Sequence, residues 1–89
     1  MRVEVHERVR DYHRALHPKA RQAVKAALLA LPKGDTKALT DQLEGFHRLR
    51  VGPHRFIWHM VDGRIRVFYA APRATVYEFL AAHLGELLR

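Results

Sequence analysis

The residues of this sequence that could do chemistry are arginines gathered in one stretch of the chain. Six arginines share the segment 46–73: Arg48, Arg50, Arg55, Arg64, Arg66 and Arg73. Asp62 is the one acidic residue there, so these positions carry +5 of a formal net charge of +7. A guanidinium keeps its charge and pairs with phosphate oxygens through two parallel hydrogen bonds. The cluster predicts a phosphate-binding surface, and a solvated arginine face that only confers solubility is the alternative.

The residue types that the chain lacks exclude several kinds of site. The chain has no cysteine, serine or asparagine, which excludes disulfides, thiolate metal sites, and serine or cysteine nucleophiles. His13 and His17 lie four residues apart on a predicted helix, a spacing that suits zinc, but no cysteine or nearby carboxylate pair completes a site. We therefore expect both histidines to be solvated, and we expect neither a metal nor another cofactor.

Length and hydropathy indicate one small domain, residues 1–89, with a modest core. The longest apolar run, 26–31, is six residues, whereas a transmembrane helix needs about 20. The N-terminus also lacks the apolar stretch of a signal peptide. These features predict a cytoplasmic protein with no membrane partner. The basic excess favours a polyanion, with nucleic acid first and an acidic protein second.

Hydrophobic periodicity predicts the elements that position the arginines. Alternating valines predict an edge strand at 2–6, and helical spacing predicts helices at 7–16 and 18–31, paired antiparallel as a hairpin. The segment 35–45 is interpreted as an ordered connection. Beyond Phe46 the period is two, and turns at Gly52-Pro53 and Asp62-Gly63 predict a three-stranded antiparallel meander. Thr75 and Glu78 form a capping box that opens a C-terminal helix. The expected fold class is α+β.

Register decides which side chains share a face of this sheet. A two-residue turn pairs Val61 with Arg64. The core face then carries Phe56, Trp58, Met60, Ile65, Val67 and Tyr69. The opposite face carries Arg55, Ile57, His59, Arg64, Arg66 and Phe68, a set too basic to be buried without partners. An even-length first turn pairs Arg50 with Arg55 and brings Arg48 beside Ile57 on this second face, which we expect to be exposed at least in part.

Specific residues carry a resemblance to a known family. They are Leu43-Glu44-Gly45, the run Arg48-Leu49-Arg50-Val51-Gly52 to Arg55, Val61-Asp62-Gly63, and Pro72-Arg73 followed by Val76-Tyr77. This pattern resembles the RelE/ParE superfamily of type II toxins, and the resemblance extends over the whole chain. It implies an N-terminal helical hairpin packed on a small antiparallel β-sheet, with a C-terminal helix. The superfamily includes ribosome-dependent mRNA endonucleases and DNA gyrase poisons on one scaffold.

The resemblance also implies an activity, because the positions that match the nuclease branch are all filled. They are Arg48, Arg50, Arg55, Arg73 and Tyr77. By resemblance the protein is a toxin that inhibits translation, a metal-independent endoribonuclease that cleaves mRNA in the ribosomal A site. The RNA 2′-hydroxyl would attack its own 3′-phosphate. The implied partners are the ribosome, mRNA and a cognate acidic antitoxin, which would cover the basic face or displace the C-terminal helix.

The identity of the general base differs from that in the best-known nuclease of the family, which has lysines at the positions of Arg48 and Arg50. An arginine keeps its proton, so it cannot act as the base. Tyr77 is the first candidate, and His54 or His47 is the alternative. The side chains expected to contact RNA outside the catalytic group are Arg64, Arg66, His54 and His47.

Two other functions stay open. One is a ParE-like gyrase poison that cuts nothing itself, and the other is a non-catalytic basic module that binds an acidic helix. His83 falls within the apolar stripe of the C-terminal helix, so we expect it to be at least partly buried rather than catalytic.

Overall fold

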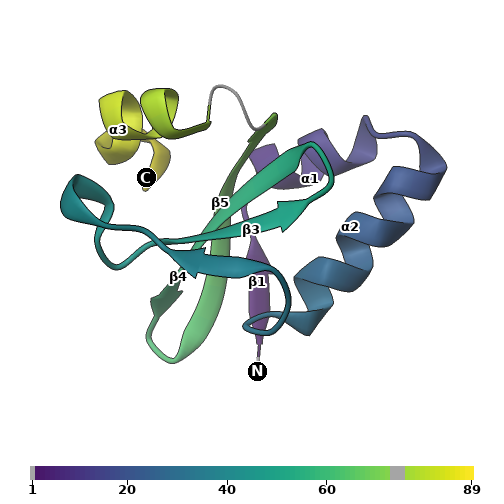
Figure 1. Ribbon diagram of the computed structural model, residues 1–89, viewed down its shortest axis with the longest axis horizontal. Helices are drawn as coiled ribbons and strands as arrows, with labels where there is room; N and C mark the ends of the chain where they lie inside the picture. The colour runs from purple at the N-terminus through teal and green to yellow at the C-terminus, as the bar shows by residue number, and fades with distance from the viewer. Residues whose placement is uncertain (1, 73–75) are drawn as a thin grey trace.

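The computed structural model describes residues 2–72 and 76–89, and within them one five-stranded sheet is flanked by three α-helices (Figure 1). The elements in chain order are β1 (Val3–Val5), α1 (Glu7–Arg14), α2 (Pro18–Ala30), β2 (Thr36–Ala38), a 3₁₀ turn (Asp41–Leu43), β3 (His47–Val51), β4 (His54–Val61), β5 (Arg64–Pro72) and α3 (Val76–Leu87). The predicted α+β class is confirmed. Among the described helices, none is long and apolar enough to cross a membrane.

Histidines begin both N-terminal helices. The His6 side chain accepts a hydrogen bond from the Arg8 backbone N–H at 3.0 Å, and His17 accepts one from Lys19 at 3.4 Å. Each ring thus satisfies one of the backbone donors left free at a helix start. Pro18 follows in the first turn, where its missing N–H costs nothing.

The sheet has the strand order β1-β5-β4-β3-β2. The edge position of β1 is confirmed, but β1 runs parallel to β5, so the sheet is mixed rather than purely antiparallel. Strand β2 pairs antiparallel with β3 and lies inside the segment that we interpreted as a connection. The residues Thr36–Ala38 do not alternate large apolar with polar side chains as Val3–Val5 do, so no sequence pattern predicted β2.

The two predicted turns set the register of the meander. Asp62 and Gly63 have φ of 50° and 75°, as a type I′ hairpin requires, and Val61 pairs with Arg64. Gly52 has φ 58° at the other turn, where Val51 pairs with His54. As predicted, Arg50 lies opposite Arg55, and Arg48 lies opposite Ile57.

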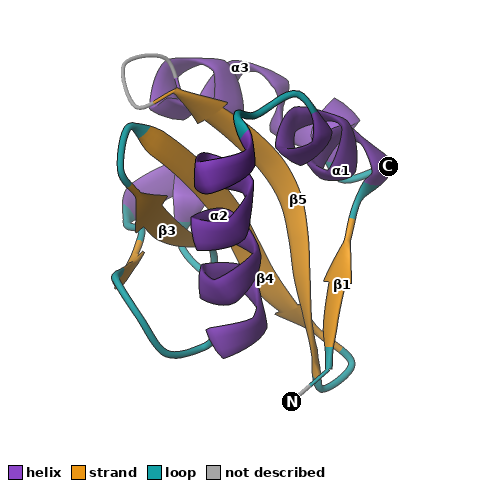
Figure 2. Cartoon of the chain, turned by 90° about the vertical axis from the view of Figure 1, so that its right-hand side faces the viewer, coloured by secondary structure: helices purple, strands orange, loops and turns teal. Residues whose placement is uncertain are grey.

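The core is in two parts, one on each face of the sheet. Helices α1 and α2 cover the first face (Figure 2), where the largest fully buried side chains include Phe56, Leu49 and Ile65. Helix α3 covers the second face and buries Ile57 and Phe68. The second face is therefore not simply the solvated basic surface that we expected, because α3 makes its centre apolar.

A bulge explains how the second face obtains its apolar centre. Ile57 pairs with Tyr69 while the next residue, Trp58, pairs with Val67, so Phe68 is an extra residue in β5. An extra residue reverses the alternation beyond it. Tyr69 consequently packs with the α3 cluster, and our placement of it on the first face was wrong. It stacks on Phe79, which we expected in the apolar stripe and which is exposed.

Helices α1 and α2 differ from the expected antiparallel pair. They are joined as predicted and lie on the same face, but they diverge from their junction (Figures 1 and 2). Val9 of α1 and Val24 of α2 are both fully buried in the first core cluster. Both helices thus contribute a fully buried valine to the core on the first face of the sheet. Thr75 of the predicted capping box lies outside the described residues.

Candidate phosphate-binding site

Three of the predicted catalytic arginines lie on the α3 face of adjacent strands. Arg48 and Arg50 are two residues apart in β3 and therefore point to the same side of the sheet. Arg55, in β4, lies opposite Arg50. Lys37 of β2 lies opposite Arg48 and adds a fourth cation to the same row. Sequence analysis missed Lys37, because no pattern predicted β2.

Asp35 binds two of these arginines. Its carboxylate accepts a hydrogen bond from Arg50 Nε at 2.6 Å, and it lies 3.8 Å from Arg48 Nη1. The Arg50 backbone N–H also donates to the Asp35 carbonyl at 3.0 Å. The hydrogen bond from Arg50 and the positive charges of Arg50, Arg48 and Arg55 lower the pKa of Asp35. The two guanidiniums are thus placed to hold an anion, and here they hold a carboxylate.

Arg55 is also part of the scaffold. Its side chain is only 8% exposed, and Nη1 donates to the carbonyls of Gly52 at 2.8 Å and His54 at 3.1 Å. These bonds tie the guanidinium to the β3–β4 turn. A buried arginine that is fixed by backbone carbonyls keeps its orientation, so Arg55 supplies a preorganised positive charge beside Arg50.

Tyr77 is the second residue of α3 and is 40% exposed. Strand β5 ends at Pro72, which pairs with His54, and α3 begins four residues later (Figure 1). The topology therefore brings the start of α3 to the end of the sheet that carries Arg55. Arg73, the fifth predicted catalytic residue, lies outside the described residues.

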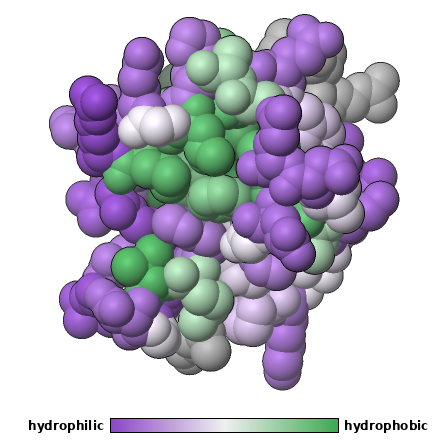
Figure 3. Space-filling model, turned by 90° about the vertical axis from the view of Figure 1, so that its left-hand side faces the viewer, coloured by the Kyte–Doolittle hydropathy of each residue, from purple (hydrophilic) through white to green (hydrophobic). Residues whose placement is uncertain are grey.

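Arg64 and Arg66 lie on the same face but toward the other edge of the sheet. Arg64 Nη1 donates to Glu4 Oε1 at 2.8 Å, and Arg66 lies opposite His59. Burial chiefly, and the charge of Arg66 second, lower the pKa of His59. The apolar cluster around Ile57 separates Arg64 and Arg66 from the other arginines on this face. Figure 3 shows apolar side chains gathered in the middle of the left-hand side of the molecule as seen in Figure 1, where α3 lies, with hydrophilic side chains around them.

The structure does not bring His47 and His54 to the arginines. His47 stacks on Trp58 in the first core cluster, with ring centroids 4.2 Å apart. His54 Nδ1 is 2.6 Å from the hydroxyl of Tyr12, on α1. Both rings therefore lie on the α1/α2 face. His47 and His54 each precede an arginine in the sequence, but adjacent residues of a strand point to opposite faces of the sheet.

The remaining histidines have structural contacts. His13 is partly buried, and its Nε2 lies 3.0 Å from the carbonyl oxygen of Arg21 on α2, so our expectation that it is solvated was wrong. His17 is exposed and caps α2. His83 is partly buried, as expected, against Phe79 at a kink in α3. Within residues 2–72 and 76–89, no three histidine, aspartate or glutamate side chains form a metal-binding group.

Sequence analysis also missed Arg8, which connects the two layers. Its Nη1 donates to the carbonyl of Leu87 at 2.6 Å and to that of Phe68 at 3.1 Å. The first carbonyl is at the end of α3 and the second is at the bulge. A cation at a helix C-terminus satisfies free carbonyls and complements the helix dipole. Arg8 thus fixes α3 on the face that carries the arginines.

By sequence, no protein-family model and no curated protein matches the chain. By structure, one chain of the toxin–antitoxin complex RelBE2 from Mycobacterium tuberculosis matches with a TM-score of 0.67 at 20% identity, over 81% of this chain and 96% of that one. The archaeal RelE–RelB complex from Pyrococcus horikoshii gives 0.65 at 24% identity, over 82% and 94%. The YoeB dimer from Staphylococcus aureus gives 0.57 at 15% identity, over 75% and 90%. The expected fold class is confirmed: the chain has the fold of the RelE/ParE-type toxins.

Proposed function

We propose that this protein is a toxin of a type II toxin–antitoxin system, a ribosome-dependent endoribonuclease that cleaves mRNA in the A site. The observation that carries the proposal is the row of cations on the α3 face: Lys37, Arg48, Arg50 and Arg55 on three adjacent strands, at the end of the sheet where α3 begins. The likeness in fold to RelE and YoeB structures supports it.

The proposed reaction is transfer within the RNA strand. The 2′-oxygen attacks the adjacent phosphorus, and the bond to the 5′-oxygen breaks, leaving a 2′,3′-cyclic phosphate and a 5′-hydroxyl end. A base takes the 2′-hydroxyl proton, and an acid gives a proton to the leaving oxygen. Arg48, Arg50 and Arg55 would stabilise the charge on the phosphorane oxygens. Tyr77, in the first turn of α3, is the proposed proton-transfer group.

The shape of the site supports the proposed requirement for the ribosome. The cations occupy a sheet face beside α3, and Arg50 and Tyr77 are exposed. Such a surface supplies charge but few contacts that orient a flexible strand. In-line attack needs the 2′-oxygen, the phosphorus and the leaving oxygen in one geometry, so an external template would have to provide it. Free RNA is accordingly expected to be a poor substrate.

The test maps cleavage of a labelled mRNA on programmed ribosomes with an empty A site, beside the same RNA in solution. Tyr77→Phe should lower the cleavage rate by about 10²–10⁴-fold, as loss of a proton-transfer group does. Arg50→Gln should lower it by about tenfold or more. Lys19→Gln, near the start of α2 on the opposite face of the sheet, is the matched control. We prefer Arg50 to Arg55 for this test because Arg55 also supports the β3–β4 turn.

Undiminished cleavage by Tyr77→Phe and Arg50→Gln would remove these residues from the mechanism. No cleavage by the folded wild-type protein would overturn the nuclease proposal. A DNA gyrase supercoiling assay would then separate a gyrase poison from a non-catalytic binding module.

A further inference from the structure

One carboxylate lies within the arginine row, which is formed by Arg48, Arg50 and Arg55 on the α3 face. Asp35 Oδ2 accepts a hydrogen bond from Arg50 Nε at 2.6 Å, and Oδ1 lies 3.8 Å from Arg48 Nη1. Among the described ion pairs, Asp35 is the only acidic partner of these two arginines. The proposed cleavage needs a base that takes the 2′-hydroxyl proton, and a guanidinium cannot be that base because it keeps its own proton. A carboxylate can accept the proton.

The backbone fixes Asp35 beside Arg50. Thr36 pairs with Leu49 in the β2–β3 ladder, and the Arg50 backbone N–H donates to the Asp35 carbonyl at 3.0 Å. The position of the carboxylate therefore does not depend on its ion pairs alone. The Asp35 side chain is 45% exposed, so a ligand that binds the arginines can also reach its oxygens.

Asp35 and Tyr77 lie on opposite flanks of the pair formed by Arg50 and Arg55. Asp35 is next to Arg50 on the side of β2. On the other side, Arg55 pairs with Ala71 of β5, and α3, which carries Tyr77 in its first turn, follows the end of β5. In-line transfer needs the base and the acid on opposite sides of the phosphorus, because the 2′-oxygen enters opposite the leaving 5′-oxygen. A phosphate bound by the two arginines would meet this requirement.

We propose that Asp35 is the general base of the RNA cleavage, an inference that rests on the proposed function. Its carboxylate takes the proton of the 2′-hydroxyl while the 2′-oxygen forms its bond to phosphorus. The bond between phosphorus and the 5′-oxygen breaks, and this oxygen receives the proton of the Tyr77 hydroxyl, so that Tyr77 acts as the acid. Exchange with solvent then returns a proton to Tyr77 and removes one from Asp35.

The charges around Asp35 suit this role. The hydrogen bond from Arg50 and the positive charges of Arg50, Arg48 and Arg55 lower the pKa of Asp35, so the carboxyl group is ionised at neutral pH. A phosphate that binds Arg48 and Arg50 takes over their hydrogen bonds and brings negative charge beside the carboxylate. Both changes raise the pKa of Asp35 and make it a stronger base once the substrate is bound.

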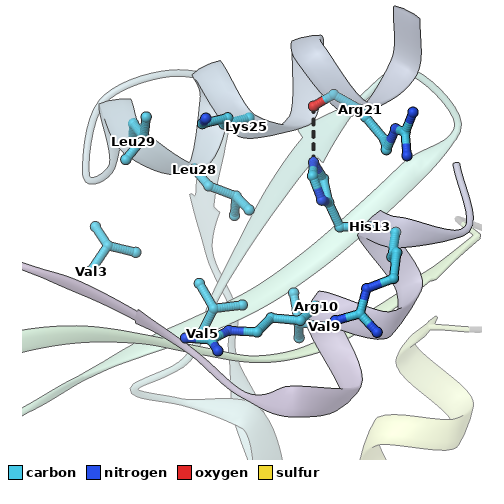
Figure 4. A pocket seen from close by; sticks show the side chains of 10 residues that line it. Val3, Val5, Val9, Arg10, His13, Arg21, Lys25, Leu28 and Leu29 are labelled. Carbon is cyan, nitrogen blue, oxygen red and sulfur yellow. Dashed lines mark hydrogen bonds between the residues drawn. The ribbon is translucent and has the colours of Figure 1, made fainter. Parts of the chain in front are cut away.

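A second basic surface lacks such a group. A groove of about 460 Å³ opens where α1 and α2 diverge, on the opposite face of the sheet (Figure 4). Its walls carry Arg10 and Arg14 from α1, and Arg21 and Lys25 from α2. The described residues that line it include no carboxylate. Cations alone therefore do not distinguish the two surfaces, whereas the carboxylate of Asp35 does.

The test measures single-turnover cleavage of the labelled mRNA on programmed ribosomes at saturating protein, beside binding of a single-stranded oligonucleotide. Asp35→Asn should lower the cleavage rate by about 10²–10⁴-fold, as loss of a general base does, while RNA binding becomes tighter. Asp35→Glu should restore part of the rate. Asp62→Asn makes the same charge change in the β4–β5 turn and should cleave like the wild type, so it is the matched control.

The pH dependence distinguishes a base from a structural residue. Between roughly pH 6 and 9 the wild-type rate should stay level, because its carboxylate is already ionised. The rate of Asp35→Asn should instead rise about tenfold per pH unit, because hydroxide replaces the lost base.

A substrate with sulfur in place of the 5′-oxygen at the cleaved bond separates the base from the acid. A thiolate leaves without being protonated, so this substrate should bring the rate of Tyr77→Phe close to that of the wild type. It should leave Asp35→Asn slow, because the 2′-hydroxyl still has to lose its proton.

Several results would overturn the proposal. These are cleavage by Asp35→Asn at the wild-type rate, full rescue of Asp35→Asn by the sulfur substrate, and a level pH profile in this variant. Parallel losses of RNA binding and cleavage would also overturn it, because they would assign Asp35 a purely structural role. If the wild-type protein leaves mRNA intact, the nuclease proposal fails and the base with it. If the wild type and Asp35→Asn cleave equally, the base alone is refuted and the nuclease stands.

Discussion

Replacing Asp35 by asparagine should strengthen the binding of single-stranded RNA and make it more dependent on salt. The Asp35 carboxylate binds Arg50 Nε at 2.6 Å and lies 3.8 Å from Arg48 Nη1. Asparagine has nearly the same size and keeps the backbone carbonyl that accepts from Arg50. The substitution removes the negative charge that pairs with the guanidiniums of Arg50 and Arg48, so both become available to phosphates.

The magnitude follows from the number of guanidiniums that are released. Each phosphate that a cation neutralises contributes about −0.7 to the slope of log affinity against log salt for a single strand. Two released guanidiniums should therefore steepen the slope by up to about 1.4. The affinity advantage of the variant over the wild type should then fall about sevenfold between roughly 50 and 200 mM salt.

The assay is fluorescence anisotropy of a short labelled oligouridine, titrated with wild-type protein and variants over a series of salt concentrations. Asp62→Asn is the control, because it makes the same charge change in the β4–β5 turn, at the other end of β4 from Arg55. An unchanged slope for Asp35→Asn would refute the reasoning. So would an equal change in Asp62→Asn, which would assign the effect to net charge rather than to these contacts.

Three further predictions concern stability. Leu49→Ala should lower the free energy of unfolding by about 2–5 kcal/mol, measured by urea titration, because Leu49 is buried in the first core cluster. Arg8→Met should increase amide hydrogen exchange at the end of α3, whose Leu87 carbonyl accepts from Arg8, and unchanged exchange would contradict this role. The pKa of His59 is lowered on folding, so the unfolded chain binds more protons below about pH 6.5 and stability should fall on acidification. Urea titrations at neutral and acidic pH should show a smaller fall in His59→Phe.

Short patterns in the sequence predict much of this fold and part of its candidate site. The turns at Gly52-Pro53 and Asp62-Gly63 determine which residues lie opposite each other, because a two-residue loop leaves one register. That register places Arg50 beside Arg55 and puts Arg48 on the same face. Pro18 marked the start of α2, and alternating valines marked β1. These features depend on residues that are close in sequence.

Only the tertiary structure decides which side chains each face of the sheet buries and which it exposes. The extra residue Phe68 turns Tyr69 to the α3 side, and no local pattern shows a bulge there because residues 67–71 are all apolar. Asp35 and Lys37 reach the arginine row because β2 pairs with β3, and the residues Thr36–Ala38 carry no apolar alternation from which this pairing could be predicted. The divergence of α1 and α2 depends on how each packs on the sheet, so the groove between them exists only once the sheet is formed. Residues close along the chain specify turns and register, whereas packing between distant segments decides which surfaces stay exposed to bind a partner.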